Sequence, residues 1–191
     1  MLQRYKQYLI ERMIFVNQLI LAGFGGQGIL SMGHFIAHAG LIENKNVSWL
    51  PSYGPEKRGG TANCSVIVGD EEVGSPIVTR ATAIIVMNRP SFEKFESYVE
   101  EGGIVIYDSS LVSDDVKTRD DIKYFGIPAT RMADEYGNAT FAGIILLGKL
   151  IKETSIIGFE SFEKSLYDVL KPSKHFLIPD EMKALKAGFD Y

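Results

Sequence analysis

The feature that most constrains the fold of this chain is a glycine-rich turn, set between two apolar segments in residues 18–40. The segment before it, Leu19–Ala22, is a short apolar run of the kind that forms a buried strand. The turn itself holds four glycines within six positions, namely Gly23, Gly25, Gly26 and Gly28. After the turn, apolar and small residues recur at helical spacing, at Ile29, Leu30, Gly33, Ile36, Ala37 and Gly40. The pattern predicts a strand that turns tightly into a helix with one closely packed face.

A turn of this kind has the chemistry of an anion site. The first N–H groups of a helix have no partner inside the helix, and the helix dipole adds positive charge beside them. Glycines allow a positive φ and let a ligand approach the backbone closely. The spacing Gly23-x-Gly25-x-x-Gly28 also fits the dinucleotide-binding fingerprint. Two interpretations stay open: a site for an anion or phosphate, and a tight turn whose glycines serve only helix–sheet packing.

Two observations argue against NAD as the ligand. A Rossmann site needs an acidic residue roughly 20 residues further on, at the end of the second strand, to bind the ribose hydroxyls. The second strand is predicted at Val47–Leu50, and it runs into Pro51-Ser52-Tyr53 without a carboxylate, while Glu43 precedes it. Gln27 suggests instead that the turn offers a side-chain amide to a ligand or partner.

Composition limits the classes of function that fit. A length of 191 residues suits one domain with a full core, and we divide the chain into an extension, 1–17, and a single domain, 18–191. The net charge of −4 argues against general binding to nucleic acid or to a membrane surface. No apolar run reaches the roughly 18 residues of a membrane span. The polar N-terminus does not resemble a signal peptide, so we expect a cytoplasmic protein.

Metal chemistry on this chain is not expected. Cys64 is the only cysteine, so the chain cannot form an internal disulfide or supply the four thiolates of the usual iron–sulfur sites. His34 and His38 share a helix face, but the intervening glutamate and a third ligand of a zinc peptidase are missing. We interpret both as surface histidines.

A second informative segment, Pro51–Thr61, contains two prolines, three glycines and charged residues, with almost nothing to bury. It is predicted to be a surface loop. Arg58 offers a planar fork for a carboxylate or phosphate, and Gly59 frees the backbone beside it. A solvated connector is the alternative, but we favour a recognition loop because loops on a rigid α/β scaffold often carry function.

The remaining pattern predicts an α/β fold of three layers, with a Rossmann-like mixed sheet, helices on both faces and a β-hairpin. The hairpin is predicted from Ala62–Val68 with Val73–Val78, and Ser91 is expected to cap a helix that Gly102 ends. Asp108 and Ser109 follow a buried strand, where α/β folds bind ligands, although an ordinary turn fits equally well. The further strands and helices are expected at Ala83–Met87, Ile104–Tyr107, Ile122–Phe125, Pro128–Tyr136, Ala139–Ile151, 160–170 and 180–187.

The chain resembles the gamma subunit of 2-oxoacid:ferredoxin oxidoreductases. The resemblance covers nearly everything from residue 18 onward, and the order and spacing of its first two motifs make it specific. The matching segments are Gly23-Phe-Gly-Gly-Gln-Gly-Ile29, Ser52-Tyr-Gly-Pro-Glu-Lys-Arg-Gly-Gly60, Gly74-Ser-Pro76, Gly103, Asp108-Ser-Ser-Leu-Val112, Pro128-Ala-Thr130, Gly137-Asn138 and Ala184-Leu-Lys-Ala-Gly-Phe189. One departure is Phe141-Ala-Gly, where related chains usually have Ala-Asn-Met.

The resemblance implies a subunit of a complex that oxidatively decarboxylates a 2-oxoacid with coenzyme A, forming acyl-CoA and CO2. Thiamine diphosphate, Mg and the iron–sulfur clusters would lie on partners: alpha and beta (thiamine-binding) subunits and a ferredoxin-like delta subunit, with ferredoxin or a similar acceptor taking the electrons. This chain would handle coenzyme A and assembly, bind no cofactor unaided and be inactive alone. The Ser-Tyr-Gly-Pro-Glu motif is most like 2-oxoglutarate enzymes, with pyruvate and ketoisovalerate enzymes also similar.

The candidate cofactor-binding residues include the glycine turn, which on this resemblance could receive a phosphate of coenzyme A. No catalytic or metal-binding residue is assigned. The candidates are Gly23, Gly25, Gly26, Gln27, Gly28, Tyr53, Glu56, Arg58, Gly59, Asp108 and Ser109. Two other functions remain as alternatives: a stand-alone Rossmann-like NAD(P)-binding oxidoreductase, and a purely architectural subunit whose glycine turn only packs.

Overall fold

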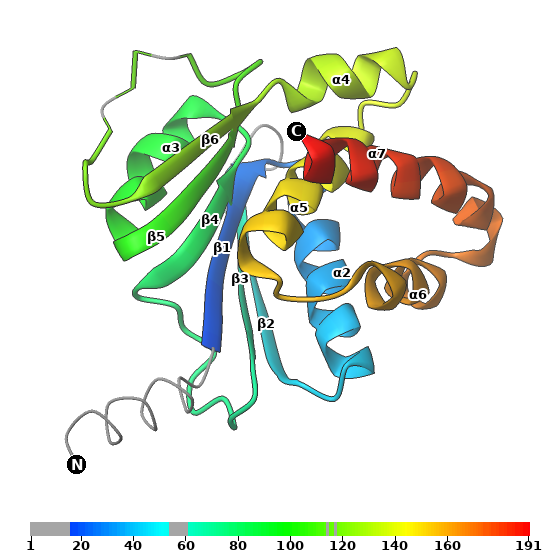
Figure 1. Ribbon diagram of the computed structural model, residues 1–191, viewed down its shortest axis with the longest axis horizontal. Coiled ribbons are helices and arrows are strands. Elements are labelled where there is room, and N and C mark those ends of the chain that lie inside the picture. The colour runs from blue at the N-terminus through cyan, green and yellow to red at the C-terminus, as the bar shows by residue number, and fades with distance from the viewer. Residues whose placement is uncertain (1–15, 54–60, 114, 117) are drawn as a thin grey trace.

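The computed structural model describes residues 16–53, 61–113, 115–116 and 118–191, and its centre is one six-stranded sheet (Figure 1). The strand order is β2-β3-β1-β4-β5-β6. Strands β1, β4, β5 and β6 run parallel, whereas β3 lies antiparallel between β1 and β2. The strands are β1 (Val16–Phe24), β2 (Asn46–Tyr53), β3 (Thr61–Gly69), β4 (Ala81–Val86), β5 (Val99–Asp108) and β6 (Lys123–Ile127).

Helices cover both faces of the sheet (Figure 1). The short helix α3 packs on one face, and α2 and α5 pack on the other, with α6 and α7 outside them. This arrangement confirms the predicted α/β fold with a mixed sheet. The helices are α2 (Ile29–Ile42), α3 (Arg89–Phe95), α4 (Ala129–Glu135), α5 (Phe141–Thr154), α6 (Phe159–Val169) and α7 (Ile178–Asp190), with 3-10 turns η1 (Glu96–Tyr98) and η2 (Pro172–Leu177).

Strand β1 divides its side chains between two cores. Leu19 and Leu21 belong to the large core on the α2 and α5 side, whereas Ile20 and Ala22 belong to the smaller core under α3. Because side chains alternate across a strand, a run that is apolar at every position can bury both of its faces. This explains why the sequence before the glycine turn is continuously apolar.

Helix α5 is buried centrally. Its residues Phe141–Ile151 are all buried. Helix α7 crosses it with the backbones in contact, because a Cβ atom at Gly148 would lie 2.0 Å from the Leu185 carbonyl oxygen, and one at Gly188 would lie 1.8 Å from the Ile145 carbonyl oxygen. Only glycine fits at these two positions.

Three local predictions were wrong. The antiparallel partners of β3 are β2 and β1, not Val73–Val78, which forms no strand. Helix α3 is capped by Asn88, whose Oδ1 accepts from the Ser91 N–H at 2.8 Å, so Ser91 is not the cap. Gly102 does not end that helix; it lies inside β5 with a φ of 79°.

Among the described residues, no helix is both long enough and apolar enough to cross a membrane.

Candidate functional site

The candidate site lies at the carboxyl end of β1, where the chain turns into α2. From this turn the chain passes through α2 to β2 and β3 on one side of β1, and it later returns as β4 on the other side. Such a switch point leaves a crevice at the carboxyl ends of the strands, and open α/β sheets bind ligands there. Gly26 and Gly28 adopt φ values of 99° and 78°, which explains why glycine occupies both positions.

The Gln27 amide holds this turn together from inside. Its Oε1 accepts from the Phe24 N–H at 2.6 Å, and its Nε2 donates to the Met87 carbonyl at 3.2 Å, at the end of β4. A Cβ atom at Gly23 would lie 2.6 Å from Gln27 Oε1, so the glycine makes room for the amide. Both ends of the amide thus make a hydrogen bond within the chain, and contact between Gln27 and a ligand stays a prediction.

The N-terminus of α2 is open to an anion. Its N-cap residue is Gly28, no side chain caps its first N–H groups, and its first turn contains no acidic residue. Gly25, Gly26 and Gly28 are exposed, so a ligand can reach the backbone. Uncapped N–H groups and the positive end of a 14-residue helix together favour a bound anion.

The predicted recognition loop begins and ends at the same edge of the sheet. Tyr53 pairs with Ala62, which in turn pairs with Gly23, and Thr61 pairs with Phe24. The register therefore brings the backbone of Tyr53 and Thr61 to the edge that carries the glycine turn. The predicted ligand-binding residues Glu56, Arg58 and Gly59 lie outside the described residues.

Asp108 is bound within the fold. It is fully buried; its Oδ2 accepts from the Thr130 N–H at 3.1 Å and the Thr130 hydroxyl at 2.5 Å, and its Oδ1 accepts from the Ser110 N–H at 3.0 Å. Ser109 is partly buried, and its N–H donates to the Ile127 carbonyl at 2.8 Å. Through these hydrogen bonds Asp108 fixes the start of α4.

Sequence reasoning gave no part in the site to four further polar residues near this edge. Asn88 and Ser91 are 3% and 1% exposed, and within the described part of the chain Asn88 Nδ2 and Ser91 Oγ have no hydrogen-bond partner. Glu181, in the first turn of α7, lines a cavity at the start of α2 together with Lys174. Glu181 is more than 150 residues from the turn in the chain, so no local sequence pattern indicates that the two lie close together.

The two histidines of α2 and Cys64 contact other parts of the fold, and Cys64 Sγ donates to the Ile29 carbonyl at 3.5 Å. His38 Nε2 is 3.3 Å from Asp168 Oδ2, and the His34 ring stacks on Trp49 at a centroid distance of 5.0 Å. Burial, with a smaller contribution from His38, lowers the pKa of His34. Cys64 is fully buried, and burial raises the pKa of its thiol to about 12. Among the described residues, no group of three or more His, Cys, Asp or Glu could hold a metal.

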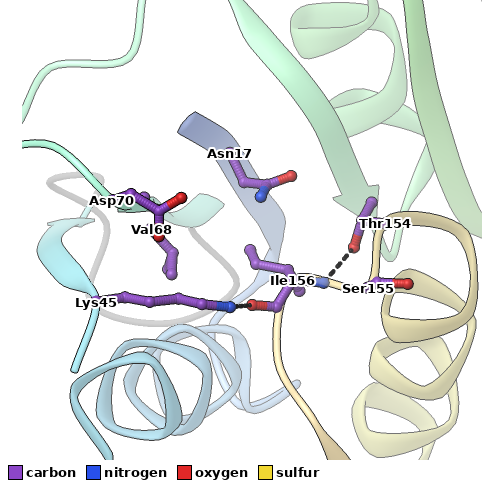
Figure 2. Close-up of a pocket in the computed structure, with 8 residues that line it drawn as sticks. Asn17, Lys45, Val68, Asp70, Thr154, Ser155 and Ile156 are labelled. Atoms are coloured by element: carbon purple, nitrogen blue, oxygen red, sulfur yellow. Dashed lines mark hydrogen bonds between the residues drawn. The ribbon is translucent and has the colours of Figure 1, made fainter. Parts of the chain in front are cut away.

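A cavity of about 270 Å³ lies at the opposite, amino end of β1, between β1, β3 and the end of α5 (Figure 2). Three of its lining residues, Lys45, Thr154 and Ile156, are joined by hydrogen bonds. Lys45 extends across the cavity, donates to the Ile156 carbonyl at 2.5 Å and is paired with Glu43 at 2.9 Å, while Thr154 Oγ1 accepts from the Ile156 N–H. These bonds tie the start of β2 to the end of α5, which is a structural role.

Comparison with known proteins identifies relatives over the whole described domain. The family model of pyruvate ferredoxin/flavodoxin oxidoreductase matches residues 18–191. Ketoisovalerate oxidoreductase subunit VorA of Methanothermobacter marburgensis is 38% identical over 90% of this chain, but the match spans only 35% of VorA. The chain thus spans about a third of the length of its VorA relatives. 2-Oxoglutarate synthase subunit KorC of Methanocaldococcus jannaschii is 36% identical over 80% of this chain and 82% of KorC.

Solved structures share the fold. The gamma subunit of a keto/oxoacid ferredoxin oxidoreductase from Geobacter sulfurreducens superposes with a TM-score of 0.76 at 24% identity, covering 91% of this chain and 96% of that one. The 2-oxoglutarate:ferredoxin oxidoreductase of Magnetococcus marinus, solved with 2-oxoglutarate, coenzyme A and succinyl-CoA, gives 0.80 at 21% identity over 91% of this chain and 30% of that one.

Proposed function

The chain belongs to the pyruvate ferredoxin/flavodoxin oxidoreductase family, and on that premise we propose that it is the gamma subunit of a 2-oxoacid:ferredoxin oxidoreductase. The observation that carries the proposal is the family match over residues 18–191, together with similarity to KorC over 82% of KorC's own length. Because KorC has about the same length as this chain and is a separate subunit by name, the match supports a separate subunit rather than a domain of a longer chain. The complex would convert a 2-oxoacid and coenzyme A into acyl-CoA and CO2 and pass the electrons to ferredoxin or a similar acceptor.

We propose 2-oxoglutarate as the substrate of the complex. Four relatives named as KorC subunits of 2-oxoglutarate synthases match this chain over 82–87% of their own lengths. The VorA relatives favour ketoisovalerate as the second candidate, because one of them has the higher identity of 38%. Turnover of 2-oxoglutarate, ketoisovalerate and pyruvate by the purified complex would decide between them.

The partner subunits would supply the redox chemistry. Thiamine diphosphate, Mg and the iron–sulfur clusters are proposed to lie on alpha, beta and ferredoxin-like delta partners. A chain with the single cysteine Cys64 cannot provide the four thiolates that the usual clusters need.

This chain's own contribution would be to hold an anionic part of coenzyme A at the glycine turn. The uncapped N–H groups at the start of α2 would donate to a phosphate, and the positive end of the helix would favour its charge. Gln27 supports this role, because its two hydrogen bonds fix the turn in the shape that exposes these groups. The interaction orients the ligand and needs no proton transfer by this chain.

The assembly proposal is tested by capturing the tagged full chain from extract of its native cells and identifying the chains that co-purify. Recovery of a thiamine-diphosphate-binding subunit is the expected result. If the chain is captured alone and instead binds NAD(P) in a titration, the gamma-subunit proposal is overturned in favour of a stand-alone oxidoreductase.

The coenzyme A proposal is tested in the captured complex with Ser31→Asp. Ser31 is exposed in the first turn of α2. A carboxylate added there interacts favourably with the helix dipole, so the variant should fold as the native chain does. The same charge repels a phosphate, so we expect KM for coenzyme A to rise about tenfold, equivalent to about 1.4 kcal/mol, with little change in kcat.

Ser31→Asn is the matched control, since it adds a similar volume without charge, keeps a side-chain hydrogen-bond donor and should leave KM within about twofold. An unchanged KM for coenzyme A in the Ser31→Asp complex would contradict the proposal. It would support the alternative in which the turn is purely architectural.

A further inference from the structure

A small cavity extends the glycine-turn site toward the C-terminal helices. Its volume is about 140 Å³, several times the roughly 30 Å³ that one water molecule occupies in the liquid. Four helical segments meet around it: the start of α2, the start of α5, the end of α6 and the η2–α7 segment. The residues that line it are Gln27, Gly28, Ser31, Met32, Phe35, Thr140, Ile144, Leu170, Lys174, Leu177 and Glu181.

Glu181 places a buried carboxyl group with an unpaired oxygen in the wall of this cavity. The residue is only 6% exposed, and its Oε2 has no hydrogen-bond partner within the described part of the chain. Leaving a buried polar group unpaired is costly, and such groups in folded proteins are almost always paired with protein, water or a ligand. The unpaired oxygen therefore points to an occupant of the cavity.

Most of the surrounding groups favour negative charge in the cavity. Neither α2 nor α5 has a side-chain cap or an acidic residue in its first turn, and both begin at the cavity, at Gly28 and Thr140. The ammonium group of Lys174 and the hydroxyl of Ser31 add hydrogen-bond donors. Both side chains are exposed, so they can move to meet a ligand.

Glu181 is compatible with an anion only when it carries a proton. Burial raises the pKa of its carboxyl group, and the nearby charge of Lys174 opposes this shift without cancelling it. The first turn of its own helix, α7, also contains Asp180, which is paired with Lys183 at 2.8 Å. A protonated carboxyl group donates one hydrogen bond, whereas a carboxylate would repel the ligand.

We propose that this cavity is an oxyanion subsite, in which the first N–H groups of α2, the Lys174 ammonium and a protonated Glu181 together bind one phosphate or carboxylate group. The inference rests on the proposed function in one respect, that the start of α2 receives an anionic ligand. The cavity is small enough for a single oxyanion group, so it recognises one end of a larger molecule.

Binding at this subsite takes up a proton. An anion that requires protonated Glu181 binds less tightly as the pH rises above the pKa of that group, by up to about tenfold per pH unit. Among the residues that line the cavity, Glu181 is the only carboxyl group, and Lys174 is the other group that can carry charge. The pH dependence therefore reports on Glu181.

The test uses sulfate, whose charge does not change between pH 5 and 8, added to the isotope-labelled full chain at constant ionic strength. Amide NMR shifts of Gly28 and the first turn of α2 should saturate with sulfate and weaken as the pH rises. Glu181→Gln keeps a neutral hydrogen-bond donor, so its sulfate affinity should be independent of pH and exceed that of the native chain at pH 8. Lys174→Met should weaken binding at least fivefold.

Lys183→Met is the matched control, because Lys183 is exposed on α7 and is paired with Asp180 at 2.8 Å. It removes the same charge outside the cavity and should leave binding unchanged. The proposal is overturned if sulfate leaves the α2 amides unshifted, or if the Lys174 and Glu181 variants bind it as the native chain does.

The outcome separates the two proposals. Sulfate binding that depends on Lys174 and Glu181, in a chain that captures no thiamine-binding partner, would support the subsite and overturn the gamma-subunit function. Capture of that partner, together with sulfate binding that does not depend on Lys174 or Glu181, would support the gamma-subunit function and overturn the subsite.

Discussion

The close crossing of α5 and α7 makes Gly188→Ala the sharpest test of the packing. An added Cβ would lie 1.8 Å from the Ile145 carbonyl oxygen and 2.6 Å from its carbon, whereas real Cβ atoms keep at least 3.0 Å from such neighbours. The obstacle is backbone, which cannot rotate away, so the two helices must separate by more than 1 Å. Overpacking of this kind costs up to about 3 kcal/mol, while alanine's better helix propensity returns about 1 kcal/mol. We therefore expect a net loss of about 2 kcal/mol.

Urea unfolding of the full chain measures this loss directly, and thermal unfolding should show a decrease in Tm of about 4–8 °C for a chain of this size. Gly74→Ala is the matched control, because a Cβ there meets nothing within 4 Å and its stability should be unchanged or slightly higher. If Gly188→Ala were as stable as the native chain, the added methyl group would have cost no more than the gain from alanine's helix propensity. The argument that the α5–α7 backbones are in obligatory contact would then be refuted.

Four further predictions concern single side chains. Asp108→Ala leaves the buried N–H and hydroxyl of Thr130 unpaired, and should lower the free energy of unfolding by about 3 kcal/mol in urea. Gln27→Ala removes two hydrogen bonds that fix the glycine turn, and should cost about 2 kcal/mol and broaden the amide NMR signals of the turn. Glu181 has a raised pKa in the folded state, so its stabilising effect is present at low pH and is lost as the pH rises; Glu181→Gln should match the native chain near pH 4 and become relatively more stable toward pH 7 in urea titrations. Cys64, fully buried with a pKa of about 12, should react with a thiol reagent at pH 8 only when the chain unfolds, and rapid labelling of the native chain would contradict its placement.

The elements that the sequence predicted correctly are those that local pattern determines. The run Leu19–Ala22 and the helical spacing after Gly28 placed β1 and α2 because both are encoded within a few residues. The 62–68 strand was also found, but its partner was not, because the pairing of β3 with β2 and β1 depends on contacts across the sheet. Local pattern favoured a hairpin between this strand and the next apolar segment, but β3 pairs instead with two strands that precede it in the chain.

The end of α3 shows the same limit. Residues 96–101 carry a helical pattern, but Val99 pairs with Ala81 of β4, and Gly102 adopts a φ of 79° inside β5. Pairing with a neighbouring parallel strand outweighed helix propensity there. Asn88 and Ser91 are both good N-cap residues, so only the observed Asn88 hydrogen bond distinguishes them.

The shape of the glycine turn was predictable from the sequence, while its ligand stays a prediction. The glycine turn is recognisable in the sequence because a positive φ strongly favours glycine, and both Gly26 and Gly28 adopt a positive φ. The inward hydrogen bonds of Gln27 could not be deduced, since one of them reaches the Met87 carbonyl on a strand 60 residues away. Glu181 and Lys174 reach the turn only because α7 packs across α5, and that contact follows from the complete fold.

The sheet topology bears on the choice between a bound anion and a bound dinucleotide. In a Rossmann site the second strand lies beside the first, so that an acidic residue at its end reaches the ribose. Here the antiparallel strand β3 lies between β1 and β2, which puts the end of β2 two strand spacings, or about 10 Å, from Gly23 along the sheet. A carboxylate there would be displaced from the ribose position, and Tyr53 occupies the end of β2 instead. Within the described residues, the fold thus has an uncapped helix start that suits a phosphate and no carboxylate at the end of β2, which favours an anionic group of another molecule as the ligand.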